Sequence, residues 1–277
     1  AYVIDKFVNT YLQGMTPNPC VDCIKHLKFG LFYDKAKEMG CDYIATGHYA
    51  RIRKEKGHYY LAESSNKKKD QTYFLYNLSE EILSKTLFPL GDMSKEEVRE
   101  IARKINLPTA EKGESQDICF VPGGNYGKVI EDAIGGKLLS GDFIGPDGKR
   151  LGAHQGIANY TVGQRKGLGI AYKEPLFVKE ISVEDNIIYL GTMSQMYKDE
   201  ILIDDVNFIN GKPDTDFNCL VRTRYHQPLQ KCTVELYGNN QARIKFDVPQ
   251  KALTLGQAAV LYTDNEIIIG GGTISMS

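Results

Sequence analysis

Apolar residues at helical spacing predict two helices in the first half of the chain. The first spans residues 25–39 and ends before Gly40, with apolar positions at Leu27, Leu31, Phe32 and Met39. The second begins at Ser94, which forms capping-box spacing with Glu97, and ends before Pro108. Its predicted buried face consists of Val98, Ile101, Ala102 and Ile105.

Strand patterns occupy most of the remaining sequence. A short strand is expected at residues 43–46, and a hairpin at residues 51–62 with its turn at residues 55–57. The polar stretch 109–117 has no periodicity and is interpreted as a mobile loop. Glycine-punctuated residues 135–169 predict a small, turn-rich β region. From residue 201 six strands are expected, at 201–209, 220–224, 233–237, 242–248, 258–263 and 267–274.

These patterns divide the chain into three predicted domains. Residues 1–125 are α/β, residues 126–203 form a small β-rich domain, and residues 204–277 form an all-β barrel or sandwich. The length of 277 residues suits more than one hydrophobic core.

Composition excludes several protein classes. With 42% hydrophobic and 25% charged residues, the chain is neither collagen-like nor disordered, and no apolar run is long enough for a membrane helix. Six cysteines are too few for a disulfide scaffold, and we expect a cytoplasmic protein. The first residues, from Ala1, resemble no signal peptide and include no initiator Met, so we expect the beginning of the natural protein to be missing.

Basic residues concentrate in one segment, although the net charge of the chain is only −1. Residues 51–69 hold seven basic and two acidic residues, interleaved with two tyrosines. The segment is either a positive face that contacts several phosphates or a solvated hairpin without a partner. Its basic residues are Arg51, Arg53, Lys54, Lys56, Lys67, Lys68 and Lys69.

The pair Cys20-x-x-Cys23 is the sharpest chemical signal. Such a pair is half of a zinc site, a redox pair, a nucleophile with a tuning neighbour, or two structural cysteines. Zinc would need His26 and a fourth ligand from Cys41, His48 or Cys119. Cys23 lies just ahead of the predicted helix, whose N-terminus favours a thiolate, so Cys23 is a candidate reactive thiol.

Other candidate residues are weaker when taken singly. Cys119 follows the predicted loop, either as a core residue or as a thiol that the loop uncovers. Gly47 and His48 follow a strand, where ligands approach α/β sheets. Residues 163–169 are interpreted as a tight turn near RNA. The remaining cysteines, Cys41, Cys219 and Cys232, are expected to be packing residues.

Four longer motifs follow one another along the chain. They are Thr16-Pro17-Asn18-Pro19-Cys20-Val21-Asp22-Cys23, Ala45-Thr46-Gly47-His48-Tyr49-Ala50-Arg51, Lys69-Asp70-Gln71-Thr72-Tyr73-Phe74-Leu75 and Ser115-Gln116-Asp117-Ile118-Cys119-Phe120. In this order they resemble the bacterial tRNA-specific 2-thiouridylase (MnmA/TrmU) family. The similarity continues through residues 160–169, Arg224-Tyr225 and Gly256-Gln257-Ala258.

The resemblance implies a fold and a reaction. The fold is an N-terminally truncated, Rossmann-type adenine-nucleotide-hydrolase-like domain, followed by a small β-rich domain and a C-terminal barrel. The reaction is ATP-dependent sulfur transfer, with Mg²⁺, to C2 of the wobble uridine in tRNAs for Lys, Glu and Gln. The partners implied are tRNA and a sulfur-relay protein or cysteine desulfurase, with no membrane.

The resemblance also implies residue roles. Cys119 carries a persulfide and Cys23 is the nucleophile, and the two end as a disulfide. Gly47 contacts ATP. Asn18, Pro19 and Cys20 line the target-base pocket, although some family members have an acid at the position of Cys20. The implied tRNA contacts are His48, Lys69, Asp70, Gln71, Arg224, Tyr225 and Gln257.

One departure from the family pattern leaves a second interpretation open. The family's Ser-Gly-Gly-Val-Asp-Ser phosphate loop is not found in these 277 residues. We therefore also expect that this chain alone is inactive, and the alternative is a non-catalytic tRNA-binding fragment. A zinc-stabilised RNA-binding protein is a third interpretation.

Overall fold

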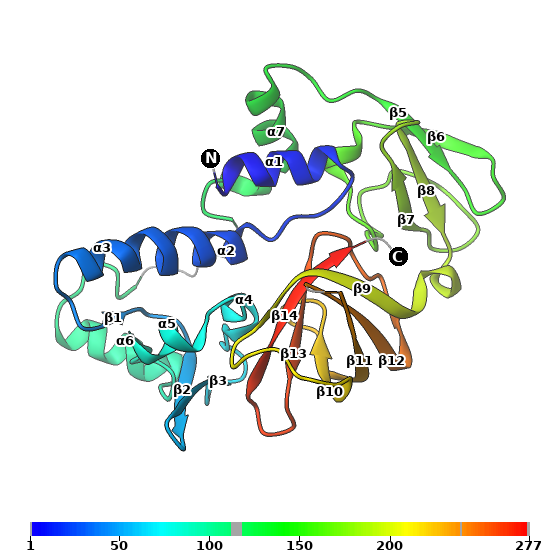
Figure 1. The fold of residues 1–277 in the computed structure, drawn as a ribbon. Coiled ribbons are helices and arrows are strands. Elements are labelled where there is room, and N and C mark those ends of the chain that lie inside the picture. Colours follow the sequence, from blue (N-terminus) through cyan, green and yellow to red (C-terminus); the bar gives the residue numbers. More distant parts are fainter. Residues whose placement is uncertain (1, 112–117, 239, 276–277) are drawn as a thin grey trace.

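The computed structural model shows three parts that follow one another along the chain (Figure 1), and it describes residues 2–111, 118–238 and 240–275. The first part combines helices with short strands. The second is a four-stranded sheet, and the third is a closed barrel. This layout agrees with the predicted fold class. Residues 112–117 of the predicted loop lie outside the described residues.

The N-terminal part begins with helices and a small parallel sheet. The first helices are α1 (Ile4–Leu12), α2 (Pro19–Asp22), the π-helical η1 (Cys23–Leu31) and α3 (Phe32–Glu38). Strand β1 (Ile44–Ala45) pairs in parallel with β4 (Thr86–Leu87). The other elements are β2 (Ala50–Glu55), β3 (His58–Glu63), α4 (Thr72–Leu75), α5 (Glu80–Ser84) and α6 (Lys95–Lys104).

The predicted helix over residues 25–39 belongs to a longer helical run that starts at Pro19. Its buried residues are Ile24 and Phe29, whereas Leu31 is 58% exposed and Met39 is 72% exposed. In a π-helix hydrogen bonds join residues five apart, so Ile24 and Phe29 share one face. The 3.6-residue period used for the prediction therefore selected other apolar residues.

The second predicted helix is α6. Its capping box is confirmed, but the prediction that one of its faces is buried is wrong. The side chain of Ser94 accepts from the backbone of Glu97, and the Glu97 carboxylate accepts from the backbone of Ser94. No residue of α6 is buried, and Ile105 is 61% exposed. Val98 and Ala102 are half-buried, whereas Ile101 and Ile105 are exposed, so the described residues cover this apolar face only in part.

The predicted hairpin is confirmed as β2 and β3, paired from Ala50–Glu63 to Glu55–His58. Lys56 and Gly57 both have positive φ angles, of 51° and 90°, as a two-residue hairpin turn of type I′ requires. The hairpin also touches the barrel, because the backbone N–H of Glu63 donates to the carbonyl of Glu266 at 2.9 Å.

The middle part contains η2 (Pro122–Gly124), α7 (Tyr126–Ile134), η3 (Ile157–Asn159) and η4 (Met193–Met196). Its sheet has the order β6-β5-β8-β7. These strands are β5 (Gly141–Ile144), β6 (Arg150–His154), β7 (Phe177–Ser182) and β8 (Ile187–Gly191). Helix α1 packs on α7, with Phe7, Val8 and Tyr11 in one buried cluster with Ile130 (Figure 1).

The C-terminal part is a closed antiparallel barrel in the order β10-β11-β12-β9-β14-β13. The strands are β9 (Tyr197–Phe208), β10 (Phe217–Arg222), β11 (Gln230–Tyr237), β12 (Gln241–Lys251), β13 (Ala258–Tyr262) and β14 (Ile268–Ser275). Each of the six predicted strands is found. The domain boundary expected at residues 203 and 204 falls within β9.

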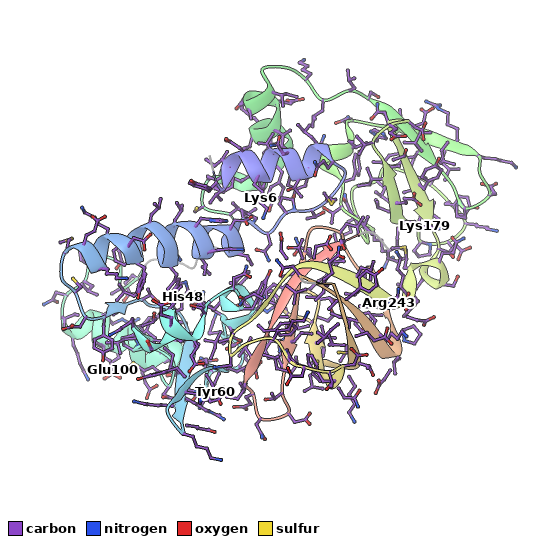
Figure 2. The ribbon with its side chains drawn as sticks, viewed as in Figure 1. Lys6, His48, Tyr60, Glu100, Lys179 and Arg243 are labelled. Atoms are coloured by element: carbon purple, nitrogen blue, oxygen red, sulfur yellow. The ribbon has the colours of Figure 1, made fainter. Side chains whose placement is uncertain are left out.

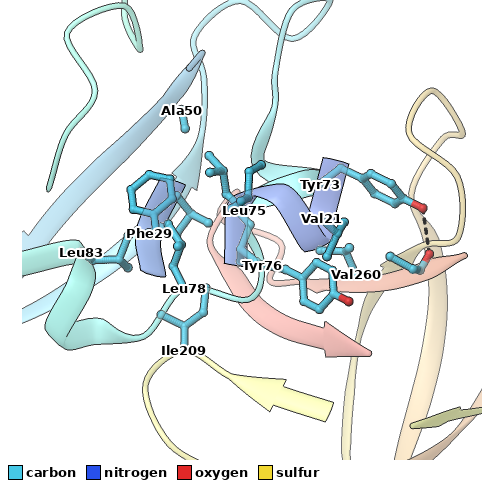
Figure 3. Packing of buried hydrophobic residues seen from close by; sticks show 14 of the residues in the cluster. Val21, Phe29, Ala50, Tyr73, Leu75, Tyr76, Leu78, Leu83, Ile209 and Val260 are labelled. Carbon is cyan, nitrogen blue, oxygen red and sulfur yellow. Dashed lines mark hydrogen bonds between the residues drawn. The ribbon is translucent and has the colours of Figure 1, made fainter. Parts of the chain in front are cut away.

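One hydrophobic core joins the N-terminal part to the barrel (Figure 3). Leu75 and Tyr76 pack in the same cluster as Val260 and Tyr262 of the barrel. The hydroxyl of Tyr73 donates to the carbonyl of Ala258 at 2.9 Å. In the part of the chain that the structure describes, no helix is long and apolar enough to cross a membrane.

Candidate functional site

Cys20 and Cys23 lie one helical turn apart, where α2 passes into η1. Pro19 occupies the first position of this turn, where a missing N–H costs nothing. Cys20 is exposed and Cys23 is half-buried. Burial around the sulfur raises the pKa of Cys20, and the nearby charges of Cys23 and Cys119 raise it further, whereas Lys28 lowers it. The three thiols therefore share one electrostatic environment.

Helix α1 connects the segments that carry these thiols. Lys6 projects from α1 (Figure 2), and its ammonium donates to the buried carboxylate of Asp22 at 2.7 Å. The next residue, Phe7, packs edge-on against Phe120 with ring centroids 5.1 Å apart. Asp22 lies between Cys20 and Cys23, and Phe120 follows the exposed Cys119. One helix thus fixes both sides of the thiol cluster.

All six cysteines are free thiols in this structure, so the disulfide between Cys23 and Cys119 stays a prediction. The described residues contain no group of three or more side chains placed to hold a metal ion. Cys41 is exposed, so its assignment to packing was wrong. Cys219 and Cys232 do pack in the barrel, as register partners with sulfurs 3.6 Å apart.

His48 is buried rather than presented to a ligand. Burial lowers its pKa to about 4, and the charge of Lys28 acts in the same direction. The neutral ring lies 3.2 Å from Lys28 Nζ through Nε2 and 2.8 Å from Thr46 Oγ1 through Nδ1. Because Lys28 carries the donor, Nε2 accepts and Nδ1–H donates to Thr46. His48 thus holds Lys28 near Cys20. Lys28 was not among the residues that the sequence motifs indicated.

Asp70 is also internal, with 3% exposure. Its carboxylate accepts from the backbone of Ser64 at 2.8 Å and from Thr72 Oγ1 at 2.6 Å. Gln71 accepts from the backbone of Tyr49 at 3.0 Å, and Lys69 is half-buried. The side chains of His48 and Asp70 are both buried and hydrogen-bonded inside the protein, and the tRNA contacts expected at these two positions stay predictions.

Three predicted tRNA contacts lie at the barrel. The side-chain amide of Gln257 donates to the carbonyls of Thr16 and Pro17 at 3.0 Å, directly before Asn18. Arg224 donates to the carbonyl of Val162 at 3.2 Å and to Thr254 Oγ1 at 2.7 Å. Tyr225 packs against Phe74 with ring centroids 4.5 Å apart. These residues connect the barrel to the other two parts.

A cavity of about 380 Å³ opens where the three parts meet. Thr16 lines the cavity and is followed in the chain by the half-buried Asn18 and the buried Pro19. The turn predicted at residues 163–169 begins at this cavity, and Gly163, Gly167 and Gly169 all have positive φ angles, as tight turns require. Its contact with RNA stays a prediction. The lining residues are Thr16, Thr161, Val162, Gly163, Gln164, Arg224, Thr254 and Gln257.

Ion pairs occupy much of the basic segment. Arg51, Arg53 and Lys67 all reach the carboxylate of Glu266, at 2.9, 3.4 and 2.6 Å. Lys67 also pairs with Glu63 at 2.9 Å. The positive face that the sequence predicted is therefore partly neutralised by the turn between β13 and β14.

Gly47 follows β1 and is exposed. A Cβ atom at this position would meet Leu90 Cδ1 at 3.6 Å, which is an ordinary contact. The end of the strand leaves a ligand room to approach the backbone, as is usual at the carboxyl ends of parallel strands. The nucleotide contact that the resemblance implies at Gly47 stays a prediction.

Three family models match the chain in sequence. They are described as the tRNA methyl transferase HUP domain, matching residues 1–123, the tRNA methyl transferase PRC-barrel domain, matching residues 127–192, and the aminomethyltransferase beta-barrel domain, matching residues 198–274. A tRNA-specific 2-thiouridylase MnmA from Clostridioides difficile (strain 630) is 44% identical, covering 99% of this chain and 77% of the relative. The chain belongs to the tRNA-specific 2-thiouridylase family.

Other relatives carry the same name. The protein from Lachnoclostridium phytofermentans is 45% identical over 99% of this chain and 77% of its own length. That from Geotalea uraniireducens (strain Rf4) is 46% identical over 98% of this chain and 72% of its own length. In this 2-thiouridylase family member, the cysteine cluster and the cavity are the features to which tRNA thiolation can be related.

Proposed function

We propose that the chain transfers sulfur to C2 of the wobble uridine in tRNAs for Lys, Glu and Gln, through a persulfide on Cys119. The observation that carries this proposal is that α1 holds both cysteine segments, through the Lys6–Asp22 hydrogen bond at 2.7 Å and the packing of Phe7 on Phe120. Family membership supports tRNA as the substrate. A sulfur-relay protein or a cysteine desulfurase would load Cys119, whose exposure permits access.

The two thiols have separate roles in the transfer. The Cys23 thiolate attacks Sγ of Cys119, and the outer sulfur of the persulfide leaves as hydrosulfide. One sulfur–sulfur bond forms between Cys23 and Cys119 as the persulfide bond breaks. Hydrosulfide then replaces the activated oxygen at C2, so no external oxidant is consumed.

The target base would enter beside the thiols. Asn18, Pro19 and Cys20 form the approach to Cys23, and Gln257 fixes the preceding backbone at Thr16 and Pro17. Arg224 places a positive charge at the adjacent cavity, where a tRNA phosphate would be attracted.

Gly47 would hold ATP at the end of β1, and Mg²⁺ would accompany the nucleotide. When bound, ATP supplies the activation of the C2 oxygen as an AMP ester, which makes it a good leaving group. The role of this chain is then to keep the strand end open at Gly47 and to hold the uridine near the two thiols.

The test combines the chain with ATP, Mg²⁺, a sulfide source and unmodified tRNA, and measures 2-thiouridine in digested tRNA. Substituting Cys23→Ser or Cys119→Ser should lower the rate by at least about a hundredfold, because each removes a nucleophile. Cys41→Ser is the matched control, since Cys41 is also an exposed free thiol. Binding of tRNA without 2-thiouridine from any variant would favour the non-catalytic alternative.

A further inference from the structure

The chain places a third thiol beside the two that the proposed reaction uses. Cys20 precedes Cys23 by three residues within one helical run, so their Cα atoms lie about 5 Å apart. Disulfides join Cα atoms roughly 4.4–6.8 Å apart. Cys20 is exposed, and therefore open to a partner from solution.

Helix α1 contacts both the segment with Cys20 and Cys23 and the segment with Cys119. Helix α1 binds Asp22 through Lys6, at 2.7 Å, and packs Phe7 against Phe120. Asp22 lies between Cys20 and Cys23, and Phe120 follows Cys119. A bond between Cys23 and Cys119 would therefore form with the Cys20 sulfur close by.

We propose that Cys20 resolves the disulfide between Cys23 and Cys119, moving the oxidised bond to the Cys20–Cys23 pair and returning Cys119 to a free thiol. This inference rests on the proposed function, which generates the first disulfide. It assigns Cys20 a redox role in addition to its expected place in the base pocket.

The exchange is balanced without another reagent. The Cys20 thiolate attacks Sγ of Cys23, the Cys20–Cys23 bond forms, and the Cys23–Cys119 bond breaks with Cys119 leaving as thiolate. The proton lost by Cys20 is taken up by Cys119 through solvent. The number of disulfides stays constant, and an external dithiol later reduces the Cys20–Cys23 bond.

Local charges favour attack by Cys20 only after the bond between Cys23 and Cys119 has formed. In the reduced protein, burial and the charges of Cys23 and Cys119 all raise the pKa of Cys20. Once those two sulfurs are joined they carry no charge, while Lys28 still favours the Cys20 thiolate. His48 holds Lys28 at 3.2 Å. Cys20 thus becomes a better nucleophile when there is a disulfide to attack.

The first experiment needs neither ATP nor tRNA. The reduced chain is oxidised with one equivalent of diamide, and samples are quenched with acid at successive times. Free thiols in each sample are then alkylated with N-ethylmaleimide, and the chain is digested with trypsin without reduction. Wild type should end with Cys20 joined to Cys23 and Cys119 alkylated, whereas Cys20→Ser should end with Cys23 joined to Cys119. A wild-type chain that keeps the Cys23–Cys119 bond and alkylates Cys20 would overturn the proposal.

Lys28→Met should slow conversion of the first disulfide into the second by at least about threefold, because it removes the charge that favours the Cys20 thiolate. Lys25→Met is the matched control, since it removes an exposed lysine from the same helix. Equal slowing by both variants would contradict the role of Lys28.

A parallel single turnover starts from persulfide-loaded chain with ATP and tRNA, and separates this inference from the proposed function. If 2-thiouridine forms while wild type keeps the Cys23–Cys119 bond, the exchange fails and the proposed function stands. If diamide produces the exchange but no 2-thiouridine forms, the proposed function fails and the exchange stands.

Discussion

The carboxyl group of Asp70 is buried and has little contact with solvent. Burial raises its pKa from 3.8 to about 6, and hydrogen bonds from Thr72 and Ser64 only partly oppose this effect. The folded state therefore favours the protonated acid more than the unfolded state does. This contribution to the free energy of unfolding is complete below pH 3.8 and disappears as the pH rises to about 6.

The first prediction concerns that pH dependence. Between pH 4 and pH 6.5, the wild type should lose roughly 2 kcal/mol of stability relative to Asp70→Asn, which cannot ionise. Urea unfolding of both proteins across this range measures the difference. Parallel pH curves would show that Asp70 ionises in the folded state as readily as in the unfolded state.

His48 and Lys28 provide a second prediction. The pKa of His48 is lowered to about 4 from 6.5, so its contribution to stability is lost as the pH falls through this range. Lys28→Met should raise the pKa of His48, because a nearby positive charge is removed. NMR titration of the ring measures the pKa, with Lys25→Met as the control, and an unchanged value would leave burial as the sole cause.

At the scale of elements, local rules predicted those features that depend on neighbouring residues. The capping box at Ser94 and the turn at Lys56-Gly57 need only a few adjacent side chains, and both were found. Which face of a helix is buried depends on π geometry and on distant neighbours. The sequence pattern therefore placed Ile105 on a buried face although it is exposed, and it overlooked the buried Ile24 and Phe29.

The third prediction tests the exposed face of α6. Ile105→Ala should change the free energy of unfolding by less than about 0.5 kcal/mol, because Ile105 is 61% exposed. Ile130→Ala, in the fully buried cluster beneath α1, should cost about 2–5 kcal/mol. Thermal or urea unfolding compares them, and similar losses would show that Ile105 is covered in solution.

The basic segment supports a fourth prediction. Lys67 is bound by Glu63 and Glu266, whereas Lys68 is exposed. If the segment contacts tRNA, Lys68→Ala should reduce the slope of log affinity against log salt by about one, and Lys67→Ala by less. Filter binding at several salt concentrations measures both slopes. Equal slopes for all three proteins would identify a solvated hairpin.

For the whole molecule, topology decided which predicted site residues came together. The cysteines at positions 20, 23 and 119 share one environment because α1 supports both of their segments, a connection that no local pattern contains. Sequence motifs named Arg224 and Gln257, but only the fold shows that they link the barrel to Val162 and Thr16. The sequence could thus name the cysteines of the cluster, but it could not predict the contacts between the parts.

Arg222 is the barrel residue whose charge enters the N-terminal part. Its guanidinium lies 3.4 Å from Glu63 and 4.0 Å from Asp70, and it stacks over Tyr262 at 5.1 Å. Without Arg222, Glu63 keeps its pair with Lys67, but the buried carboxyl group of Asp70 loses its only cation among these contacts. An uncompensated buried charge costs up to about 3–5 kcal/mol. Arg222→Met should therefore weaken the junction where the two parts share a core.

The fifth prediction follows for unfolding of the entire chain. In wild type, the shared core should make α4 and β10 lose protection from hydrogen exchange at the same urea concentration. With Arg222→Met, α4 should lose protection first while β10 stays protected, because the closed barrel pairs each of its strands on both sides. Arg243→Met is the control, since its ion pairs are exposed and 4.0 Å long and contribute at most about 1 kcal/mol. If α4 and β10 still lose protection together in Arg222→Met, the packing of Tyr73, Tyr76 and Val260 suffices to couple the two parts without the buried charges.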